Sequence, residues 1–182
     1  MEERKYLTQS ETETVLQWLK KNKNVRDYCL VLLLYRHGLR VSEAVNLKWN
    51  DISYRDRTIY ISRIKAGKSG THPLSEHELR TLSRLRNYYI ENKIIGPYIF
   101  VNLRTGLALT RYAVNKLCDE INAAKVVPVR IHPHTFRHSC GYYLANQGYD
   151  IRLIQDYLGH RNINNTLIYT TIAEHRFRII KW

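Results

Sequence analysis

The feature that most constrains the fold is a segment from Val25 to His37 that is rich in apolar residues and is followed by Gly38. Its apolar side chains are nearly continuous and do not form one stripe, so a helix built from them must be buried on most sides. Glycine adopts the left-handed conformation that commonly ends a helix, and Gly38 stands where such an end is needed. We therefore expect a central buried helix over about 25–37, with the rest of the chain packed around it.

Helix signals recur along the rest of the chain. Thr8 and Glu11 have the spacing of a capping box, and Ser75 and Glu78 repeat it. Residues 98–101 are apolar, and their pattern leaves helix and strand open. Besides the central helix, helices are expected at about 9–21, 39–44, 75–91, 110–124, 135–147, 150–158 and 164–170.

One segment has the composition of strands. Residues 58–62 (TIYIS) are β-branched and aromatic, and a cationic, glycine-bearing turn follows within 65–74. The predicted fold class is therefore mainly α with a small antiparallel β-sheet, between residues 51 and 74, inserted near the N-terminal third (α+β). No repeat or Pro/Gly linker divides the sequence, so residues 1–182 are expected to form a single domain.

The charge of the chain indicates its class of partner. It has 29 Lys and Arg against 16 Asp and Glu, a formal net charge of +13. Such an excess in a folded domain favours a polyanion, and nucleic acid first. A ribosome-associated or merely basic protein is the alternative that charge alone leaves open. Apolar residues make up 44% of the chain, which argues against global disorder.

Cysteine usage and the absence of long apolar segments indicate the compartment. Cys29, Cys118 and Cys140 are far apart and form no CxxC pair, so neither a disulfide framework nor a zinc site is indicated. The first ten residues contain no apolar signal core, and the longest apolar run, 29–35, is too short to span a bilayer. We expect a cytoplasmic protein that does not bind membranes.

Residues 132–169 contain groups suited to phosphate chemistry. His134 and Arg137 are three apart, so on a helix they share a face, and an Arg guanidinium can bind two phosphate oxygens at once. His160 follows a glycine at an expected helix end, and Tyr169 lies nine positions later. An exposed tyrosine can act as a covalent nucleophile when the phosphate is held still.

Each polar candidate also has a structural interpretation. His134 and His138 are four apart, as in zinc-binding helices, but the Glu of an HExxH motif is missing between them. Arg137 projects into the same region, so no metal is expected. Arg40 directly follows a helix end and either enters a cleft or is solvated. Glu43 either orients Arg40 through an ion pair or is a surface acid.

Two lysines, Lys65 and Lys68, lie in the turn expected between the strands. A cationic turn is most often solvated, but a lysine in it can also enter a DNA groove or protonate a leaving oxygen. Tyr169 is one of 14 tyrosines and is distinguished only by its position after His160.

Taken in order, these motifs resemble those of the tyrosine recombinase (phage integrase) family. The matching elements are GLRVSE at 38–43, Lys65, HTFRH at 134–138, LGH at 158–160 and Tyr169. One element alone is weak evidence, whereas the ordered set is specific and spans nearly the whole chain. The chain is most similar to the short recombinases that invert fimbrial promoter segments in enterobacteria, notably through HPHTFRHSCGYYLANQG and IRLIQDYLGHRNI.

The resemblance implies a catalytic role for each matching residue. Arg40, Arg137 and His160 would hold the scissile phosphate and stabilise its pentavalent transition state. Tyr169 would attack the phosphate and form a 3′-phosphotyrosyl bond. This bond keeps the energy of the phosphodiester, so the resemblance implies neither a metal nor another cofactor.

The remaining roles also follow from the resemblance. His134 would act as a proton acceptor or a phosphate donor, and Lys65 would protonate the departing 5′ oxygen. Glu43 would support the catalytic residues. The expected DNA contacts are Lys68, Arg63, His138 and Arg161.

As a whole, the chain is expected to be a tyrosine recombinase catalytic domain without a separate N-terminal core-binding domain. The expected function is inversion of a DNA segment, as in fimbrial phase switching. The expected partners are double-stranded DNA with inverted repeat sites, three further copies in a homotetramer on the synapsed DNA, and accessory DNA-bending proteins. The alternatives are an integrase or excisionase of a mobile element, a type IB topoisomerase-like enzyme, and a DNA-binding transcriptional regulator.

Overall fold

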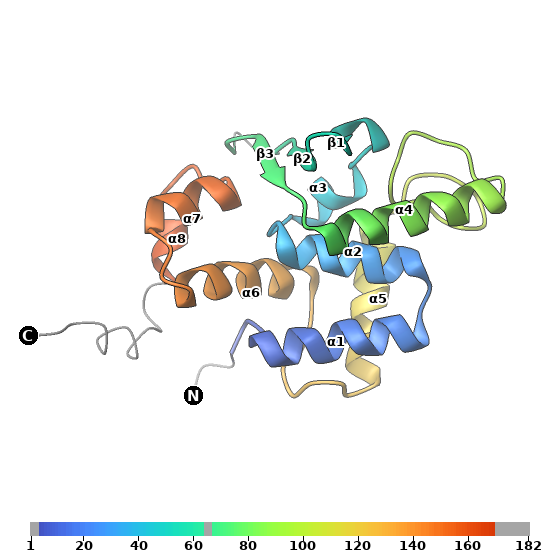
Figure 1. Ribbon diagram of the computed structural model, residues 1–182. Coiled ribbons are helices and arrows are strands. Elements are labelled where there is room, and N and C mark those ends of the chain that lie inside the picture. The colour runs from blue at the N-terminus through green and yellow to red at the C-terminus, as the bar shows by residue number, and fades with distance from the viewer. Residues whose placement is uncertain (1–3, 64–66, 170–182) are drawn as a thin grey trace, which may run out of the picture.

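The computed structural model describes residues 4–63 and 67–169 of the chain (Figure 1). The helices are α1 (Gln9–Asn22), α2 (Val25–Arg36), α3 (Val41–Val45), α4 (Glu76–Glu91), α5 (Arg111–Ala123), α6 (Pro133–Asn146), α7 (Ile151–Leu158) and α8 (Asn164–Leu167), with the 3-10 helix η1 (Trp49–Asp51). The strands are β1 (Ile52–Ser53), β2 (Thr58–Ile61) and β3 (Gly70–Pro73). This mainly helical fold with a small inserted sheet confirms the predicted fold class.

Helix α2 is the centre of the fold, as its composition predicts. It packs against α1, α3, α4 and α6, and Figure 1 shows it in the middle of the helices. Leu30, Val31 and Leu32 are successive residues and so point to different sides of this helix, yet each is at most 2% exposed. The chain then turns at Gly38, where φ is +55° and an added Cβ would lie 2.3 Å from Leu158 Cδ2. Both the backbone conformation and this close approach require glycine.

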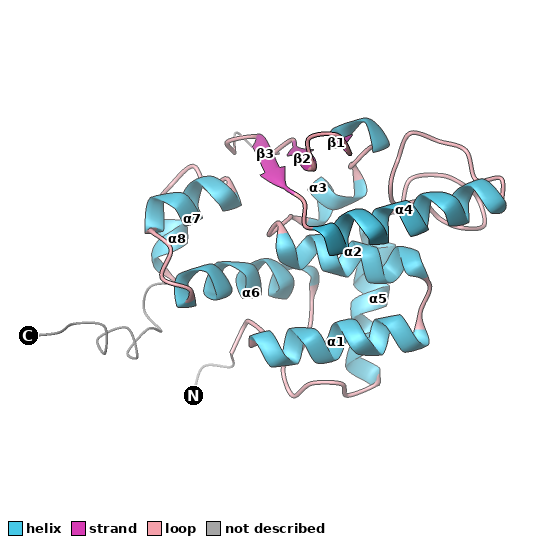
Figure 2. Ribbon diagram, viewed as in Figure 1, coloured by secondary structure: helices cyan, strands magenta, loops and turns pink. Residues whose placement is uncertain are grey.

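The three strands form one antiparallel sheet in the order β1-β2-β3 (Figure 2). Ile52 pairs with Ile59, and Ile61 pairs with Gly70. Along β2 the side chains alternate between faces. Ile59 and Ile61 are fully buried, whereas Tyr60 between them is exposed. The sheet thus adds one apolar face to the core that surrounds α2.

Local sequence signals place most helix ends correctly. Thr8 and Ser75 both cap helices as predicted, each accepting a hydrogen bond from the backbone N–H three residues later. Helix α8 is shorter than the expected helix at 164–170. Residues 98–101 form neither a helix nor a regular strand, but two isolated bridges. Within the described ranges, no helix is long and apolar enough to cross a membrane.

Truncation of a buried side chain in α2 tests its central position. Leu33→Ala is expected to lower the free energy of unfolding by about 2–5 kcal/mol, because it removes apolar contacts and leaves a cavity. Ile90→Ala is the matched control, since Ile90 is 68% exposed on α4, and its change is expected to stay within about 0.5 kcal/mol. Urea denaturation of the three proteins gives the comparison. Equal losses in the two variants would contradict a core centred on α2.

Candidate active site

The buried side chain of Arg137 joins two turns of the chain. Arg137 lies on α6 and is 3% exposed. Its Nη1 donates a hydrogen bond to the carbonyl of Gly38, and its Nη2 donates one to the carbonyl of Leu158 at 2.8 Å. Burial, together with Arg40 and Arg63 nearby, lowers the pKa of Arg137 to about 10. The guanidinium therefore remains charged at neutral pH and is fixed where the ends of α2 and α7 meet.

A buried carboxylate, Glu43, holds two further arginines. Its Oε1 accepts a hydrogen bond from Arg40 Nη1 at 2.7 Å, and its Oε2 accepts one from Arg63 Nη1 at 2.7 Å. Burial opposes ionisation of Glu43, but Arg63 and Arg40 more than offset it and keep its pKa below the ordinary value. Glu43 is thus an ion-pair partner that orients Arg40 and is not a surface acid. Arg40 itself keeps 27% of its side chain exposed.

The position of Arg63 corrects the expectation that it contacts DNA. Its side chain is 1% exposed. Besides Glu43, its guanidinium donates hydrogen bonds to the carbonyl of Tyr157 at 2.6 Å and to that of His37 at 3.4 Å. An added Cβ on Gly159 would lie 2.8 Å from Arg63 Nε. All of these contacts are internal, so Arg63 fixes Glu43 against the end of α7. The sequence gives no local signal of this burial.

His160 follows the left-handed C-cap of α7, Gly159, whose φ is +66°. Its ring is buried, and Nδ1 lies 2.9 Å from the hydroxyl of Thr166. Burial, with a further contribution from Arg137 and Arg40, lowers the pKa of His160 to about 3. The imidazole is therefore neutral at pH 7 and offers a fixed hydrogen-bonding group beside the arginines.

Tyr169 lies in the same cluster but is only 2% exposed, so the expectation of an exposed tyrosine is wrong. Its ring is nearly parallel to that of His160, at 6.3 Å between centroids, and meets Tyr142 edge-on at 5.1 Å. Burial raises the pKa of Tyr169 to about 12, although Arg137 and Arg40 oppose this effect.

The position of the Tyr169 ring depends on Gly141, a residue that was not among those predicted from the sequence to form the site. An added Cβ on Gly141 would lie 2.5 Å from Tyr169 Cζ, so only glycine leaves room for the ring. A signal was present, because glycine inside a helix costs about 1 kcal/mol relative to alanine and thus suggests a close contact. The hydroxyl of Tyr169 lies 3.3 Å from Nδ1 of His138, on the preceding turn of α6. His138 is half-buried and faces the tyrosine.

The other predicted site residues differ in placement. His134 lies in the first turn of α6, and partial burial and Arg137 lower its pKa. Lys68 is exposed and pairs with Asp156 at 3.0 Å, and Arg161 is exposed directly after His160. The prediction for Lys65 falls outside the described residues.

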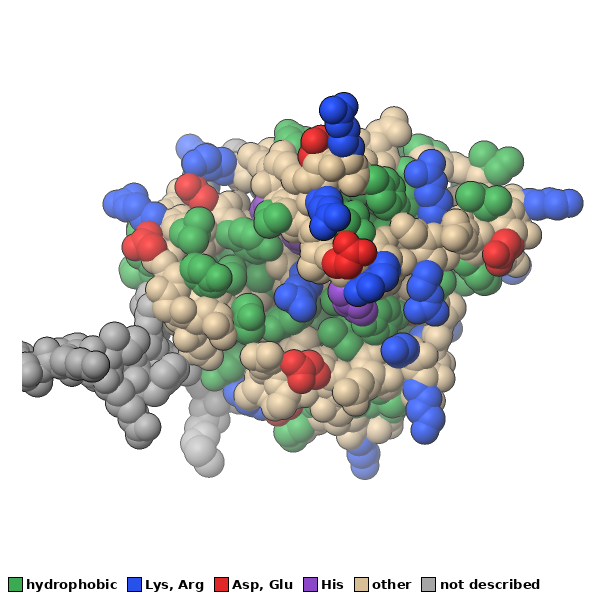
Figure 3. Space-filling view, in the orientation of Figure 1, with side chains coloured by type: hydrophobic (Ala, Val, Ile, Leu, Met, Phe, Trp, Pro, Cys, Tyr) green, Lys and Arg blue, Asp and Glu red, His purple; other side chains and the backbone are tan. Residues whose placement is uncertain are grey.

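Figure 3 shows Lys and Arg side chains spread over one face of the molecule. The described part of the chain contains no cluster of three or more metal-ligating side chains.

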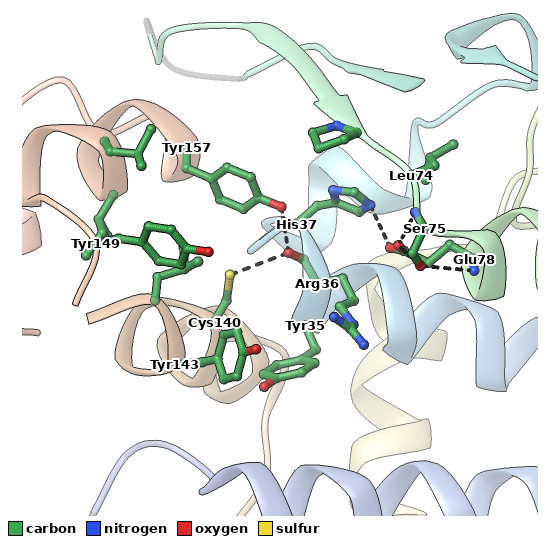
Figure 4. Close-up of a pocket in the computed structure, with 14 residues that line it drawn as sticks. Tyr35, Arg36, His37, Leu74, Ser75, Glu78, Cys140, Tyr143, Tyr149 and Tyr157 are labelled. Atoms are coloured by element: carbon green, nitrogen blue, oxygen red, sulfur yellow. Dashed lines mark hydrogen bonds and ion pairs between the residues drawn. The ribbon is translucent and has the colours of Figure 1, made fainter. Parts of the chain in front are cut away.

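A separate hollow of about 600 Å³ lies on another side of the α2, α6 and α7 junction (Figure 4). Tyr157 and Cys140 in its wall both donate to the carbonyl of Arg36, at 2.9 and 3.6 Å. These bonds attach α7 and α6 to the end of α2. The lining is mostly apolar and includes none of the arginines bound to Glu43 or to the two turns. The hollow therefore borders the support of the site and not the site itself.

Comparison with known proteins gives a consistent result. The model of the phage integrase family matches residues 5–176. The type 1 fimbriae regulatory protein FimB of Escherichia coli K12 is 40% identical over 178 residues, covering 96% of this chain and 88% of FimB. FimE of the same strain is 39% identical over 180 residues, covering 97% of this chain and 90% of FimE.

A solved structure supports the same similarity. The crystal structure of the XerH site-specific recombinase, bound to a palindromic difH substrate in a post-cleavage complex, is similar with a TM-score of 0.81 and 27% identity. The match covers 97% of this chain and 51% of that chain. The similarity therefore extends over nearly all of the fold described above, including the elements that carry the site.

Removal of Arg63 tests whether it holds the buried carboxylate. Arg63→Ala is expected to lower the free energy of unfolding by about 3–5 kcal/mol, because Glu43 stays buried without one of its two cations. Arg63→Met combined with Glu43→Gln should recover part of this loss, since no buried charge is then left unbalanced. Arg161→Ala is the exposed control, with a change within about 0.5 kcal/mol expected. If Arg63→Ala in urea denaturation is as stable as this control, the assigned network is wrong.

Proposed function

This chain belongs to the phage integrase family and is a site-specific DNA recombinase, and we propose that its reaction is the inversion of a DNA segment that carries a promoter. The similarity to FimB and FimE over almost the whole chain supports a role in switching fimbrial expression. We further propose that the substrate is double-stranded DNA with inverted repeat sites. Exposed cationic side chains such as Lys68 and Arg161 supply sequence-independent contacts to its phosphates.

One observation carries the chemical part of the proposal. Arg40 and Arg137 are 97 positions apart in the sequence, yet hydrogen bonds bring Arg137 directly, and Arg40 through Glu43 and Arg63, to the end of α7 beside Tyr169, and both charges act on its phenol. His160 packs against the same ring. Two cations, one neutral imidazole and one nucleophile in one cluster are the groups needed to bind and attack a phosphodiester. Their sequence separation means that only the tertiary fold brings them together.

The cleavage step then uses these residues in fixed roles. Arg40, Arg137 and His160 hold the scissile phosphate and stabilise the charge of its pentavalent transition state. Tyr169 Oη forms a bond to phosphorus as the bond from phosphorus to the 5′ oxygen breaks. Lys65 gives a proton to the departing 5′ oxygen. The product is a 3′-phosphotyrosyl bond and a free 5′ hydroxyl.

Rejoining is the reverse of this step with a different strand. The 5′ hydroxyl of a partner duplex attacks the phosphotyrosyl bond, and two rounds through a four-way junction exchange both strands. The energy of the phosphodiester is kept throughout, so neither metal nor ATP takes part in the proposed reaction. We include in the proposal a homotetramer on the synapsed DNA and accessory proteins that bend the DNA. His134 contributes a hydrogen bond to the phosphate from the first turn of α6.

The same site chemistry also fits an integrase or excisionase, or an enzyme that relaxes a single duplex. Inversion is favoured because FimB and FimE match so much of the chain. A regulator that only occupies DNA is disfavoured because it has no use for the convergence of Arg40, Arg137 and Tyr169.

An assay on a plasmid with two inverted sites tests the function directly. The sites are selected from random duplexes by their binding to the purified protein. Wild type is expected to invert the intervening segment, and Tyr169→Phe is expected to bind the sites without inverting it, because the phenol oxygen is the nucleophile. Relaxation of the plasmid by wild type without inversion would show a topoisomerase-like enzyme. Binding without cleavage by wild type would show a regulator.

A DNA substrate with sulfur in place of the bridging 5′ oxygen distinguishes the role of Lys65 from that of Lys68. A 5′ alkoxide leaves poorly without a proton, so a general acid contributes roughly a hundredfold to ten-thousandfold in rate. A sulfur in the same position leaves readily without one. Lys65→Ala is therefore expected to cleave normal DNA very slowly and the 5′-bridging phosphorothiolate at close to the wild-type rate.

Lys68→Ala is the matched control in the same turn. It is expected to bind more weakly and to lose similar rates on both substrates, as a residue that contacts the DNA backbone. If Lys65→Ala is equally slow on both substrates, Lys65 positions the DNA and donates no proton. If the sulfur substrate instead restores the cleavage rate of Lys68→Ala, the general acid is Lys68.

A further inference from the structure

The hydroxyl of Tyr169 has a basic partner, the imidazole of His138. Tyr169 Oη lies 3.3 Å from Nδ1 of His138. The family resemblance predicts that His138 contacts DNA, and in the structure its ring faces the tyrosine with 6.0 Å between centroids. A nucleophile within hydrogen-bond reach of an imidazole is the arrangement in which proton removal activates the nucleophile, and the contact is often looser before substrate binds.

The packing around the ring fixes this contact. His138 and Gly141 are three positions apart on α6 and so share a face of the helix. The missing Cβ of Gly141 lets the phenol lie against the helix. His160 and Tyr142 contact the ring from two other directions. These contacts orient the ring so that its hydroxyl oxygen points to His138, one helical turn before Gly141.

From this geometry we propose that His138 is the general base that takes the phenolic proton of Tyr169 during strand cleavage. The proposal rests on the function proposed above and adds a catalytic residue to it. His160 is not suited to the task, because its ring is parallel to the phenol and its Nδ1 is bonded to Thr166. The imidazole bonded to the nucleophile is that of His138.

The charges around His138 keep it in the form that can accept a proton. Burial, together with His134, His132 and Arg137 on or next to α6 and Lys5 from the N-terminal segment, lowers its pKa to about 4. The remaining titratable groups facing it are Tyr169 and, from the end of α7, His160. His138 is thus neutral before DNA binds, with a lone pair on Nδ1 when Nε2 carries the hydrogen. A bound phosphate anion offsets the surrounding positive charge and makes the protonated form easier to reach.

The proposed step conserves atoms and charge. The O–H bond of Tyr169 breaks and its proton moves to Nδ1 of His138, while the phenolic oxygen forms a bond to phosphorus. The bond from phosphorus to the 5′ oxygen breaks, and the general acid of the reaction protonates that oxygen. On rejoining, the His138 imidazolium returns the proton to the tyrosine oxygen as it leaves phosphorus. Both residues end in their starting forms.

Cleavage kinetics on a nicked suicide substrate test the role of His138. His138→Ala and His138→Gln are both expected to lower the single-turnover rate by about a hundredfold to ten-thousandfold, since neither side chain accepts the proton. The loss should be the same on the 5′-bridging phosphorothiolate, because sulfur relieves only the need for an acid. DNA affinity should stay within about twofold of wild type, which also shows that the variants fold. The matched control is His77→Ala, since His77 lies 2.9 Å from the hydroxyl of another tyrosine, Tyr28, away from the site.

A more acidic phenol at position 169 tests whether His138 acts as a base or only as a structural residue. Site-specific replacement of Tyr169 by difluorotyrosine is expected to restore most of the lost rate in His138→Ala, since the proton then leaves without help. Wild type should change little.

Each other result has a distinct meaning. If wild type forms no covalent adduct, the proposed function itself fails. If wild type reacts and His138→Ala matches it, or if fluorination leaves the loss unchanged, His138 is not the base. Faster cleavage by His138→Ala would show that the bond restrains Tyr169 at rest, and this too would overturn the proposal.

Discussion

A buried positive charge must be surrounded by hydrogen-bond acceptors or anions, and this constraint organises the whole site. Arg137 meets it with two backbone carbonyls, at Gly38 and Leu158, so its position also fixes the ends of α2 and α7. Arg63 meets it with Glu43 and further carbonyls. One carboxylate therefore lies among three arginines, and the site holds more positive charge than it balances. In the proposed reaction a phosphodiester supplies the missing negative charge, so the excess positive charge of the site favours binding of DNA.

Glycines set the distances within this arrangement. Gly38 lets the turn after α2 approach Leu158, and Gly159 lets the turn after α7 approach Arg63. Gly141 does the same for the ring of Tyr169 on α6. In each case a single Cβ would lie closer than 3 Å to a neighbouring atom. The groups of the site can converge because the side chains of Leu158, Arg63 and Tyr169 lie directly against the backbone at these three glycines.

The sequence predicts the parts of this account that depend on local signals or on ordered motifs. The continuous apolar run indicates the buried α2, capping boxes place two helix starts, and motif order identifies the family. The burial of Arg63 and Tyr169 was not predictable in this way. Arg63 is internal because the sheet places it on the end of α7, nearly a hundred residues later in the chain. Tyr169 is buried because Gly141 leaves room for it, and this contact exists only once residues 168–169, directly after α8, lie against α6. Long-range packing decides both.

The most direct test of the account is to identify the residue that becomes joined to DNA. Wild-type protein is reacted with a nicked suicide substrate, digested, and analysed by peptide mass spectrometry for a nucleotide adduct. The account predicts one adduct, a 3′-phosphate ester on Tyr169, in a protein that contains 14 tyrosines. An adduct on any other residue, or cleaved DNA without a covalent adduct, would contradict it.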